Sequence, residues 1–379
     1  MKTASPCIPA LIVLSLIAPD CRPREPGWAG RIENVDGVTV VHNPSRPRTE
    51  DRVLVLEEDL SIGQEGGGPE YLFSGIGGLA VDTAGAIYAI DTREAAVRVF
   101  DKNGVYLRTI GRKGQGPGET QYPVFVQVLA SGELAVYDYS AARMLFYSLA
   151  GVYLRQKTTP RAVLPIGLDS EGRLIAQHIL APPPKGGKVL LRFDRDYGPE
   201  QELAREEMGK DKVFDIGRPS CYVALSPNDT VLWGDSREYQ LYMLSPEGRL
   251  LKRIVKETRP RAITEAERDG YRKKYADALK FGMQLSFRDR FAEFSGVFFD
   301  DKGRLFVRTY ERAGGSPDSF TYDVFAPDGV YESKVAVPAT LDRNTVWKDG
   351  RIYTVESDED GLPLIKRHKV VWKRGAPAS

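Results

Sequence analysis

Six side chains that could bind a cation or a polar ligand recur at one position of a repeated pattern. Each lies six residues after a tight turn, mostly of the type Asp-x-x-Gly, where a short apolar strand ends. The six are Asp91, Asp138, His178, Asp235, Thr309 and Glu356. If these strand ends surround one axis, the mainly acidic set could hold a cation or a polar ligand. The alternative, and the more frequent role of such an aspartate, is to accept hydrogen bonds from amides of the next loop, which leaves His178 as the odd member.

A glycine-rich loop at 111–119 carries three more charged groups, Arg112, Lys113 and Glu119. It is superficially like a phosphate cradle, but it lacks the GxxxxGK[ST] spacing and opens no predicted helix. Pro117-Gly118 suits the centre of a type II turn, which explains the glycines without a ligand. We therefore interpret the loop as a turn from which the three charged side chains project.

Metal and nucleophile chemistry find little support in the sequence. The three histidines are scattered over different predicted elements, and the chain has no GxSxG elbow. The acidic loop 357–361 could contribute to a calcium site, but it lacks the spacing of a full calcium loop. We expect no cofactor, with calcium as the one alternative.

The elements that must position these residues are short strands joined by tight turns. Segments such as AIYAI and AVRVF are rich in β-branched and aromatic residues. The turn glycines Gly85 and Gly104 are 19 residues apart, and the same spacing recurs in two later units. Six such units, each with strands a to d, predict a propeller blade apiece, with the paired turns joining a to b and c to d.

The last unit supplies only three strands before the chain ends, and an N-terminal segment supplies the fourth. Residues 53–62 repeat the outer strand and glycine-rich exit that end the first unit at Ile110-Gly111. We predict that they complete the sixth blade, so that the two ends of the chain close the ring and remove free sheet edges. The predicted fold is therefore all-β, a six-bladed β-propeller closed by an N-terminal strand, with one helical insertion.

The insertions are predicted to gather on one face of this propeller. In a four-stranded blade the a–b and c–d hairpins lie on one face, and the b–c loops and d–a linkers lie on the other. The insertions fall in the second group, at 181–187, 199–220, 257–292 and 311–319. Function usually lies on the face that tolerates insertions. Further residues predicted there, of types common in binding sites, are Arg93, Tyr139, Arg237, Tyr310 and Arg312.

One insertion contains a predicted helix, at about 262–284. Thr264 and Glu267 have the spacing of a capping box. Tyr271 and Tyr275 then fall on one face of the helix and predict that it docks on the propeller. The alternative is a lid or a partner-binding helix, because basic side chains lie on its other side.

The segment IDTREAAVRVFDKNG resembles an NHL-type repeat, with an Asp after strand b and an Arg leading into strand c. With GRKGQGPGE and an N-terminal GVTVVHNP behind an export signal, the chain is similar to a bacterial family of exported six-bladed propellers. The resemblance covers nearly all of the mature chain and is strongest in blades one and two. It implies the fold and the compartment, with ligand binding as a general habit. The metal-binding histidine sets of some enzymatic relatives are not matched.

The first 21 residues have the pattern of an export signal. Lys2 is followed by an apolar run, 8–18, that is too short to span a bilayer. Cys21 then stands where a bacterial lipoprotein carries its lipid, although the residues before it depart from the usual motif. A disulfide with Cys221 is the alternative. We expect an exported protein, periplasmic or anchored in the envelope by a lipid, with segments divided into signal 1–21, linker 22–37, propeller 38–373 and tail 374–379.

The balance of charged residues limits the classes of partner that the protein is expected to bind. Fifty-three Lys and Arg residues against 52 Asp and Glu leave a net charge of +1, which disfavours nucleic-acid binding. Two functions follow for what we expect to be a monomer. The favoured one is a binding or scaffolding propeller that recognises a peptide, glycan or protein through the face with the insertions. The alternative is a hydrolase or lyase acting on a sugar, lactone or peptide, which carboxylates converging at the channel would favour.

Overall fold

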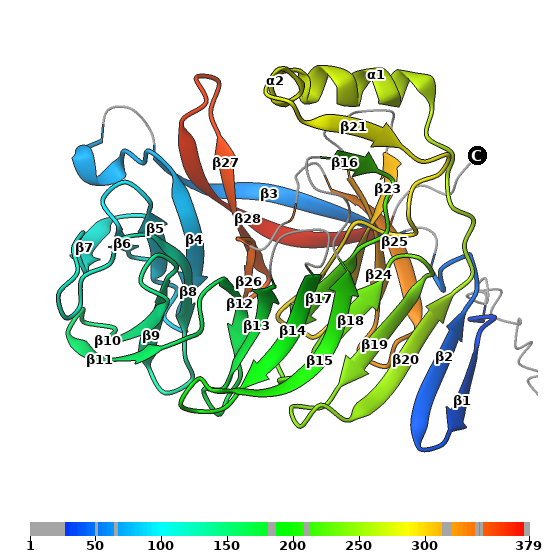
Figure 1. The fold of residues 1–379 in the computed structure, drawn as a ribbon, viewed down its shortest axis with the longest axis horizontal. Coiled ribbons are helices and arrows are strands. Elements are labelled where there is room, and N and C mark those ends of the chain that lie inside the picture. The colour runs from blue at the N-terminus through cyan, green and yellow to red at the C-terminus, as the bar shows by residue number, and fades with distance from the viewer. Residues whose placement is uncertain are drawn as a thin grey trace, which may run out of the picture.

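The computed structural model describes residues 27–49, 52–63, 67–180, 187–207, 213–312, 320–337, 341 and 344–374. Six antiparallel four-stranded sheets are arranged as the blades of a propeller (Figure 1). The innermost strands of successive blades lie side by side around the axis. The predicted all-β fold with six blades is confirmed.

The first five blades run from the innermost strand a to the outermost strand d in chain order. Blade one, preceded by a 3₁₀ turn at Pro69–Tyr71, comprises β4 (Ile76–Val81), β5 (Ile87–Asp91), β6 (Ala96–Phe100) and β7 (Tyr106–Ile110). Blade two comprises β8 (Pro123–Val128), β9 (Glu133–Asp138), β10 (Arg143–Ser148) and β11 (Tyr153–Thr158). Blade three comprises β12 (Val163–Leu168), β13 (Leu174–Ile179), β14 (Gly187–Phe193) and β15 (Pro199–Glu207). Blade four comprises β17 (Cys221–Leu225), β18 (Val231–Asp235), β19 (Gln240–Leu244) and β20 (Leu250–Lys256). Blade five comprises β22 (Gly296–Phe299), β23 (Leu305–Arg312), β24 (Phe320–Phe325) and β25 (Tyr331–Val337).

The sixth blade is closed by the N-terminal strand, as predicted. Its order is β26 (Val346–Lys348), β27 (Arg351–Ser357), β28 (Pro363–Arg374) and β3 (Arg52–Ile62). β3 pairs antiparallel with β28 and places Leu54 opposite Trp372 and Ile62 opposite Ile365. Leu54 and Ile62 are buried, so the closing strand contributes apolar side chains to the core as well as hydrogen bonds.

An N-terminal hairpin extends blade four to six strands. β2 (Val38–Asn43) runs parallel to β20, and β1 (Arg31–Val35) lies outside it. The hairpin turn is Asp36-Gly37, whose positive φ angles of 52° and 82° suit a two-residue hairpin. The expectation of a linker up to residue 37 is therefore wrong for β1. Its strand RIENV is exposed throughout, so its sequence lacks the alternation that reveals a half-buried strand.

The helical insertion stands on the upper side of the molecule in Figure 1. α1 (Glu265–Lys274) and α2 (Ala276–Lys280) follow one another and lead into β21 (Gln284–Phe287), which pairs parallel with β16 (Val213–Ile216). α1 begins with the predicted capping box. Its tyrosine stripe packs on this two-stranded sheet, with the rings of Tyr275 and Phe214 4.4 Å apart.

The interpretation of 199–220 as one linker needs correction, because its first part is the outer strand β15. The sequence PEQELAREE is rich in charged residues of high helix propensity. Its strand conformation is set by pairing with β14, a tertiary effect that the segment's own sequence does not encode.

The core lies between neighbouring blades. One apolar cluster joins Tyr88 and Ile90 of blade one to Val126 and Leu145 of blade two, and comparable clusters fill the other contacts between neighbouring blades. Each blade is thus buried on two sides by its neighbours, and the ring must be complete for every cluster to be covered. No helix in the described part of the chain is long and apolar enough to cross a membrane.

Candidate ligand-binding site

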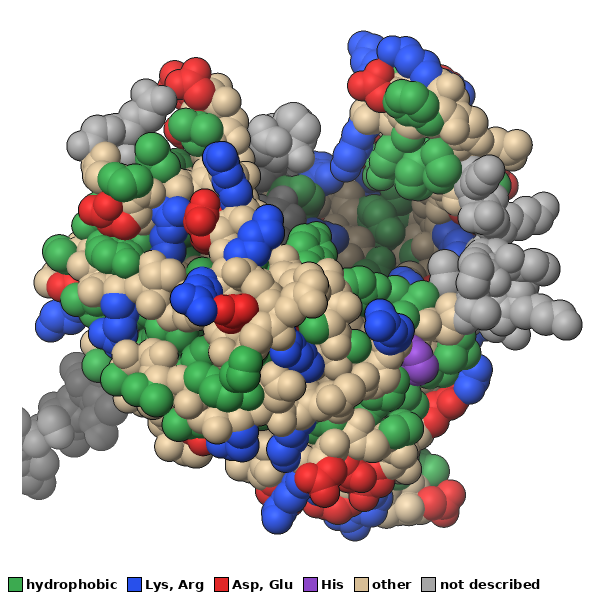
Figure 2. All heavy atoms as spheres, turned by 60° about the vertical axis from the view of Figure 1, so that its left-hand side comes forward, with side chains coloured by type: hydrophobic (Ala, Val, Ile, Leu, Met, Phe, Trp, Pro, Cys, Tyr) green, Lys and Arg blue, Asp and Glu red, His purple; other side chains and the backbone are tan. Residues whose placement is uncertain are grey.

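The described insertions lie on the face formed by the b–c loops and d–a linkers, which we call the variable face. The helices α1 and α2 and the pair β16–β21 all belong to d–a linkers, and Figure 1 shows them together above the blades. Figure 2 shows a hollow beneath this insertion, with hydrophobic side chains inside it and Lys and Arg side chains near its rim. Most of the predicted b–c insertions, 181–186 and 313–319, lie outside the described residues.

Two aspartates of the predicted ring form hydrogen bonds and ion pairs within their own blades. Asp91 is buried; one oxygen accepts the amides of Arg93 and Glu94 at 2.9 and 3.1 Å, and the other pairs with Arg98. Asp138 is fully buried, and its carboxylate accepts two backbone amides of the preceding linker at 2.9 and 3.0 Å. These carboxylates hold loops, which is the structural alternative that the sequence left open.

Asp235 is the third aspartate at such a strand end and is bound by Arg237. The Arg237 amide donates to it at 3.0 Å and the Arg237 Nε at 2.8 Å. Burial raises the pKa of Asp235, but the hydrogen bonds and charge of Arg237 outweigh burial and leave the pKa below its usual value. The carboxylate is therefore ionised and already neutralised by its neighbour.

The other three residues of the predicted ring also have contacts of their own and do not meet at one site. Thr309 donates to the carbonyl of Thr321, and Glu356 contacts His368 at 3.2 Å. His178 is half-buried on β13 and lies outside the channel cavity described below. In the described part of the chain, no group of three or more His, Cys, Asp or Glu side chains is placed to hold a metal ion.

The two loops that could have bound phosphate or calcium are occupied by their own side chains. Glu119 accepts the Gly116 amide at 2.9 Å and pairs with Arg112 at 2.6 Å, while Lys113 is exposed beside them. Asp358 accepts the amides of Asp360 and Leu362 within the acidic loop, at 3.0 and 2.8 Å. Both loops thus have the geometry of self-satisfied turns.

Three further predicted residues make aromatic contacts on this face. The ring of Tyr139 meets that of Tyr122 edge to face at 6.5 Å. Tyr310 stacks on Phe291 at 4.3 Å, and the guanidinium of Arg312 lies 3.9 Å from the centre of the Phe320 ring. Tyr139 belongs to blade two, whereas Tyr310 and Arg312 lie on β23 of blade five, so the three residues do not converge on one site.

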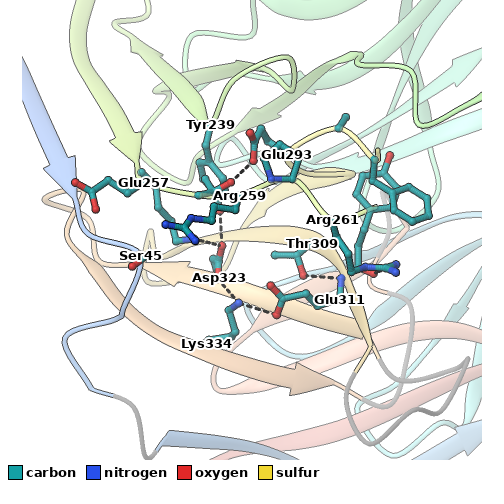
Figure 3. Close-up of a pocket in the computed structure, with 16 residues that line it drawn as sticks. Ser45, Tyr239, Glu257, Arg259, Arg261, Glu293, Thr309, Glu311, Asp323 and Lys334 are labelled. Atoms are coloured by element: carbon teal, nitrogen blue, oxygen red, sulfur yellow. Dashed lines mark hydrogen bonds and ion pairs between the residues drawn. The ribbon is translucent and has the colours of Figure 1, made fainter. Parts of the chain in front are cut away.

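Tyr310 does line one cavity, shown in Figure 3, between blades four and five. Its volume is about 500 Å³, and its charged lining residues are balanced in sign. The cations are Lys256, Arg259, Arg261 and Lys334, and the acids are Glu257, Glu293, Glu311 and Asp323. Half of these groups satisfy one another, because Lys256 pairs with Asp323 and Lys334 lies between Glu311 and Asp323, as the dashed lines in Figure 3 show.

Asp323 is the centre of that network. It is fully buried and accepts hydrogen bonds from Tyr331 at 2.6 Å and Tyr239 at 2.8 Å, with Lys256 3.2 Å away. Lys256 also lies 4.8 Å from the centres of both tyrosine rings. A buried charge pair with this many partners fixes the geometry where blades four and five meet.

The second cavity on the variable face is the upper part of the central channel, with a volume of about 570 Å³. It is lined by strand a of blades one to five, which bring Phe125, Tyr222 and Phe298 to its wall. Cys221 and Gly296 begin their strands and therefore lie toward the variable face. The surface of the cavity is divided between apolar and polar groups in similar amounts, which suits a small ligand that has both.

Only two charged side chains, Lys188 and Arg308, belong to the described lining of this cavity, and both are cations. Arg308 is held by Ser295, to whose hydroxyl it donates at 2.9 Å and to whose carbonyl it donates at 2.8 Å. The upper channel thus differs from the cavity of Figure 3, because its cations are not matched by acids in its wall.

The cysteine in this lining is not an activated nucleophile. Burial raises the pKa of Cys221 to about 11, and the nearby carboxylates Glu206 and Asp235 add to the shift. A thiol with so high a pKa stays protonated near neutral pH, and the thiolate is the reactive form. The cysteine therefore serves as a small apolar wall residue. Its proposed disulfide partner, Cys21, lies outside the described residues.

Sequence reasoning missed Lys188, Tyr222 and Arg308. Arg308 directly precedes Thr309, the residue predicted for this position of the ring. The prediction therefore selected the neighbouring residue on the same strand. Lys188 follows an insertion in the b–c loop, and the length of that insertion does not determine how the residues of β14 align with those of β13. The alternation of side chains along a strand is a signal that could have found Arg308, because it places Arg308 and Thr309 on opposite sides once the strands of the blades are aligned.

Comparisons with known proteins agree with this architecture. Residues 69–176 match a protein-family model, DUF5128, described as a 6-bladed β-propeller. The match spans blades one and two and reaches into β13, the region where the resemblance in sequence is strongest. No curated protein matches the chain.

Solved structures provide the wider comparison. The chain is similar to a protein from Bacteroides fragilis that is named as a putative exported protein, with 12% identity and a TM-score of 0.51, covering 88% of this chain and 100% of that one. A DUF4221 family member from Bacteroides vulgatus has 10% identity and a TM-score of 0.49, covering 86% and 100%. Virginiamycin B lyase from Staphylococcus aureus has 9% identity and a TM-score of 0.44, covering 84% and 100%. The chain therefore has the fold of a six-bladed β-propeller, and its residues 69–176 match a family of such propellers.

Proposed function

We propose that the protein is an extracytoplasmic binding propeller that recognises a peptide, glycan or protein partner through its variable face. The observation that carries the proposal is the channel cavity of about 570 Å³ that opens on the face with the insertions. Its volume lies within the usual range for ligand pockets, roughly 300–1,000 Å³. Because the wall is built from five blades, a ligand in the cavity contacts several blades at once.

The composition of the wall supports binding over hydrolysis or lyase chemistry. Its described residues include no Asp or Glu, whereas general acid–base work on a sugar or lactone most often uses carboxylates or histidine. The Cys221 thiol is protonated. Aromatic walls with a few polar groups are the pattern of recognition sites.

The compartment is part of the proposal. The apolar N-terminal run supports export, as does the similarity to a protein named as exported. We further propose lipid attachment at Cys21, which would hold the propeller at a membrane surface as a monomer. Membrane fractionation of a Cys21→Ser variant tests this: release into the soluble fraction is expected, and unchanged membrane association would remove the lipid from the proposal.

The binding role is tested with a thermal-shift screen of the purified mature protein against peptide and glycan collections, with and without calcium. We expect at least one class to raise the melting temperature. A Gly296→Leu variant should abolish that shift, because a side chain at Gly296 would grow into the cavity beside Arg308, 3.6 Å from its Nε.

The matched control is Ser131→Leu, an exposed residue in an a–b hairpin on the opposite face. It adds the same apolar side chain without entering the channel and should leave ligand binding unchanged. Ligand binding that survives Gly296→Leu would mean that the channel is not the site.

A further inference from the structure

The charged side chains in the described lining of the upper channel are all of one sign. Its described lining contains Lys188 and Arg308 and no carboxylate. Within the described part of the chain, neither cation lies within 4.0 Å of a carboxylate oxygen. Some other half-buried or buried arginines pair with acids, as Arg98 does with Asp91 and Arg304 with Asp300, whereas Arg108 donates to the Leu149 carbonyl.

Arg308 is held in position for a ligand. Its Nε and Nη2 atoms donate to the hydroxyl and carbonyl oxygens of Ser295, which fixes one edge of the guanidinium. The ring of Phe320 lies 5.6 Å away and covers one side. These contacts neutralise no charge, because both acceptors are uncharged oxygens.

The acid nearest to Lys188 in the strand pairing is bound elsewhere. Lys188 lies opposite Glu206 in the β14–β15 register. The Glu206 carboxylate accepts the Ser220 hydroxyl at 3.0 and 3.1 Å and the Cys221 amide at 3.2 Å. Glu206 therefore holds the linker into blade four and is not among the residues that line the cavity.

An apolar wall adjoins the two cations. Phe125, Tyr222 and Phe298 come from strand a of three different blades. Phe298 is stacked on Phe306 at 5.0 Å, and Tyr222 contacts Phe294 at 5.6 Å, so both rings are supported from behind. A rigid aromatic surface of this kind buries an apolar group at little cost in side-chain entropy.

Two unmatched cations in a partly desolvated cavity are unfavourable, and a bound anion offsets part of their charge. A carboxylate suits them best in an apolar setting, since Arg binds it through paired hydrogen bonds. We propose that the channel binds a small organic carboxylate whose charged group lies between Lys188 and Arg308 and whose apolar body lies on the aromatic wall. This inference rests on the proposed function and names the ligand class of that site.

The test uses the purified mature protein and a pair of probes that differ only in charge, N-acetylphenylalanine and its amide, measured by titration calorimetry. The acid should bind at least about tenfold more tightly than the amide, as expected for charge-assisted hydrogen bonds. Glucuronate serves as a second carboxylate that lacks an apolar body, and it should bind more weakly than N-acetylphenylalanine. This comparison separates a peptide C-terminus from an acidic sugar as the source of the carboxylate.

Lys188→Gln and Arg308→Gln should each reduce the affinity for the acid by about tenfold and leave the affinity for the amide unchanged. The control is Lys302→Gln, which removes one positive charge from an exposed a–b hairpin of blade five on the opposite face. It should behave like the unmodified protein. Circular dichroism melting checks that all three variants are folded.

Equal affinity of the protein for the acid and for the amide would overturn the inference. The inference would also be overturned if Lys188→Gln and Arg308→Gln bound the acid as tightly as the control Lys302→Gln does. Binding of glucuronate in preference to N-acetylphenylalanine would overturn the apolar part of the ligand. Suppose that neither carboxylate binds, and that an uncharged ligand found in the screen binds the unmodified protein but not the Gly296→Leu variant. The inference then fails and the proposed function stands. If Gly296→Leu leaves every ligand in place, the proposed function fails.

Discussion

Carboxylates at the strand ends stabilise the blades through backbone amides, and this is chemistry that residue type and position predict. Asp91 and Asp235 accept amides from the loops that follow them, as an aspartate after a strand commonly does. What residue type could not predict is which side chains face the channel. Arg308 and Thr309 are adjacent in sequence, yet only Arg308 lines the channel cavity, because neighbouring strand residues point to opposite sides.

Glu356 provides a test at the level of one carboxylate. Its hydrogen bond with His368 is the largest cause that lowers its pKa from 4.5 to about 2. Because the folded-state pKa lies below the unfolded one, ionised Glu356 stabilises the fold above about pH 4.5. That contribution, at most about 3 kcal/mol, is lost as the pH falls toward 2.

We therefore expect Glu356→Gln to lower the free energy of unfolding near neutral pH, with the difference from the unmodified protein shrinking as the pH falls from about 5 to about 2. Urea unfolding over a pH series measures it. Glu359→Gln, at an exposed position of the following loop, is the control and should show no such trend. A difference that stays constant over this pH range would contradict the assigned role.

Among the secondary-structure elements, those with strong local signals were predicted from sequence and those set by pairing were not. The turn glycines indicated the positions of the hairpins, because glycine adopts positive φ angles without steric cost. Gly85 and Gly104 have such angles in the structure. The closing strand β3 was found because it repeats the pattern of β7. By contrast, β1 and β15 are charged outer strands whose conformation depends on a neighbouring strand.

The helical insertion divides in the same way. The capping box of α1 follows from Thr264 and Glu267 alone, and its Arg261 partner strengthens it by lowering the pKa of Glu267 to about 2. The surface on which the helix docks could not be predicted, because it is the sheet β16–β21 formed by two linkers far apart in sequence. Stacking of Tyr275 on Phe214 shows how the two linkers become one unit.

For the molecule as a whole, closure of the ring is the feature on which stability should depend most. Leu54 of β3 is 3% exposed and packs in the cluster between blades five and six, whereas Val53 is 42% exposed. Leu54→Ala should lower the free energy of unfolding by about 2–5 kcal/mol. Val53→Ala on the same strand should change it by less than about 0.5 kcal/mol.

Denaturant unfolding of the two variants measures this difference. Deleting 53–62 altogether should abolish the single cooperative transition, since the neighbouring clusters would lose their cover, while removing 1–25 should preserve it. Equal effects of Leu54→Ala and Val53→Ala, or cooperative melting after the deletion, would contradict the role of β3 in closure.

The N-terminal segment runs along the outside of three blades before the first blade begins. β2 pairs with β20 of blade four, the amides of Arg48 and Thr49 donate to β25 of blade five, and β3 completes blade six. A ribosome or a translocation pore releases this segment first, yet each of its partners emerges much later. β3 therefore stays unpaired, and the ring stays open, until the last strand is out, although the four strands of each of the first five blades follow one another in the chain. The protein should gain its native structure in a late, concerted step, which makes holding chaperones at the exit site important for its yield.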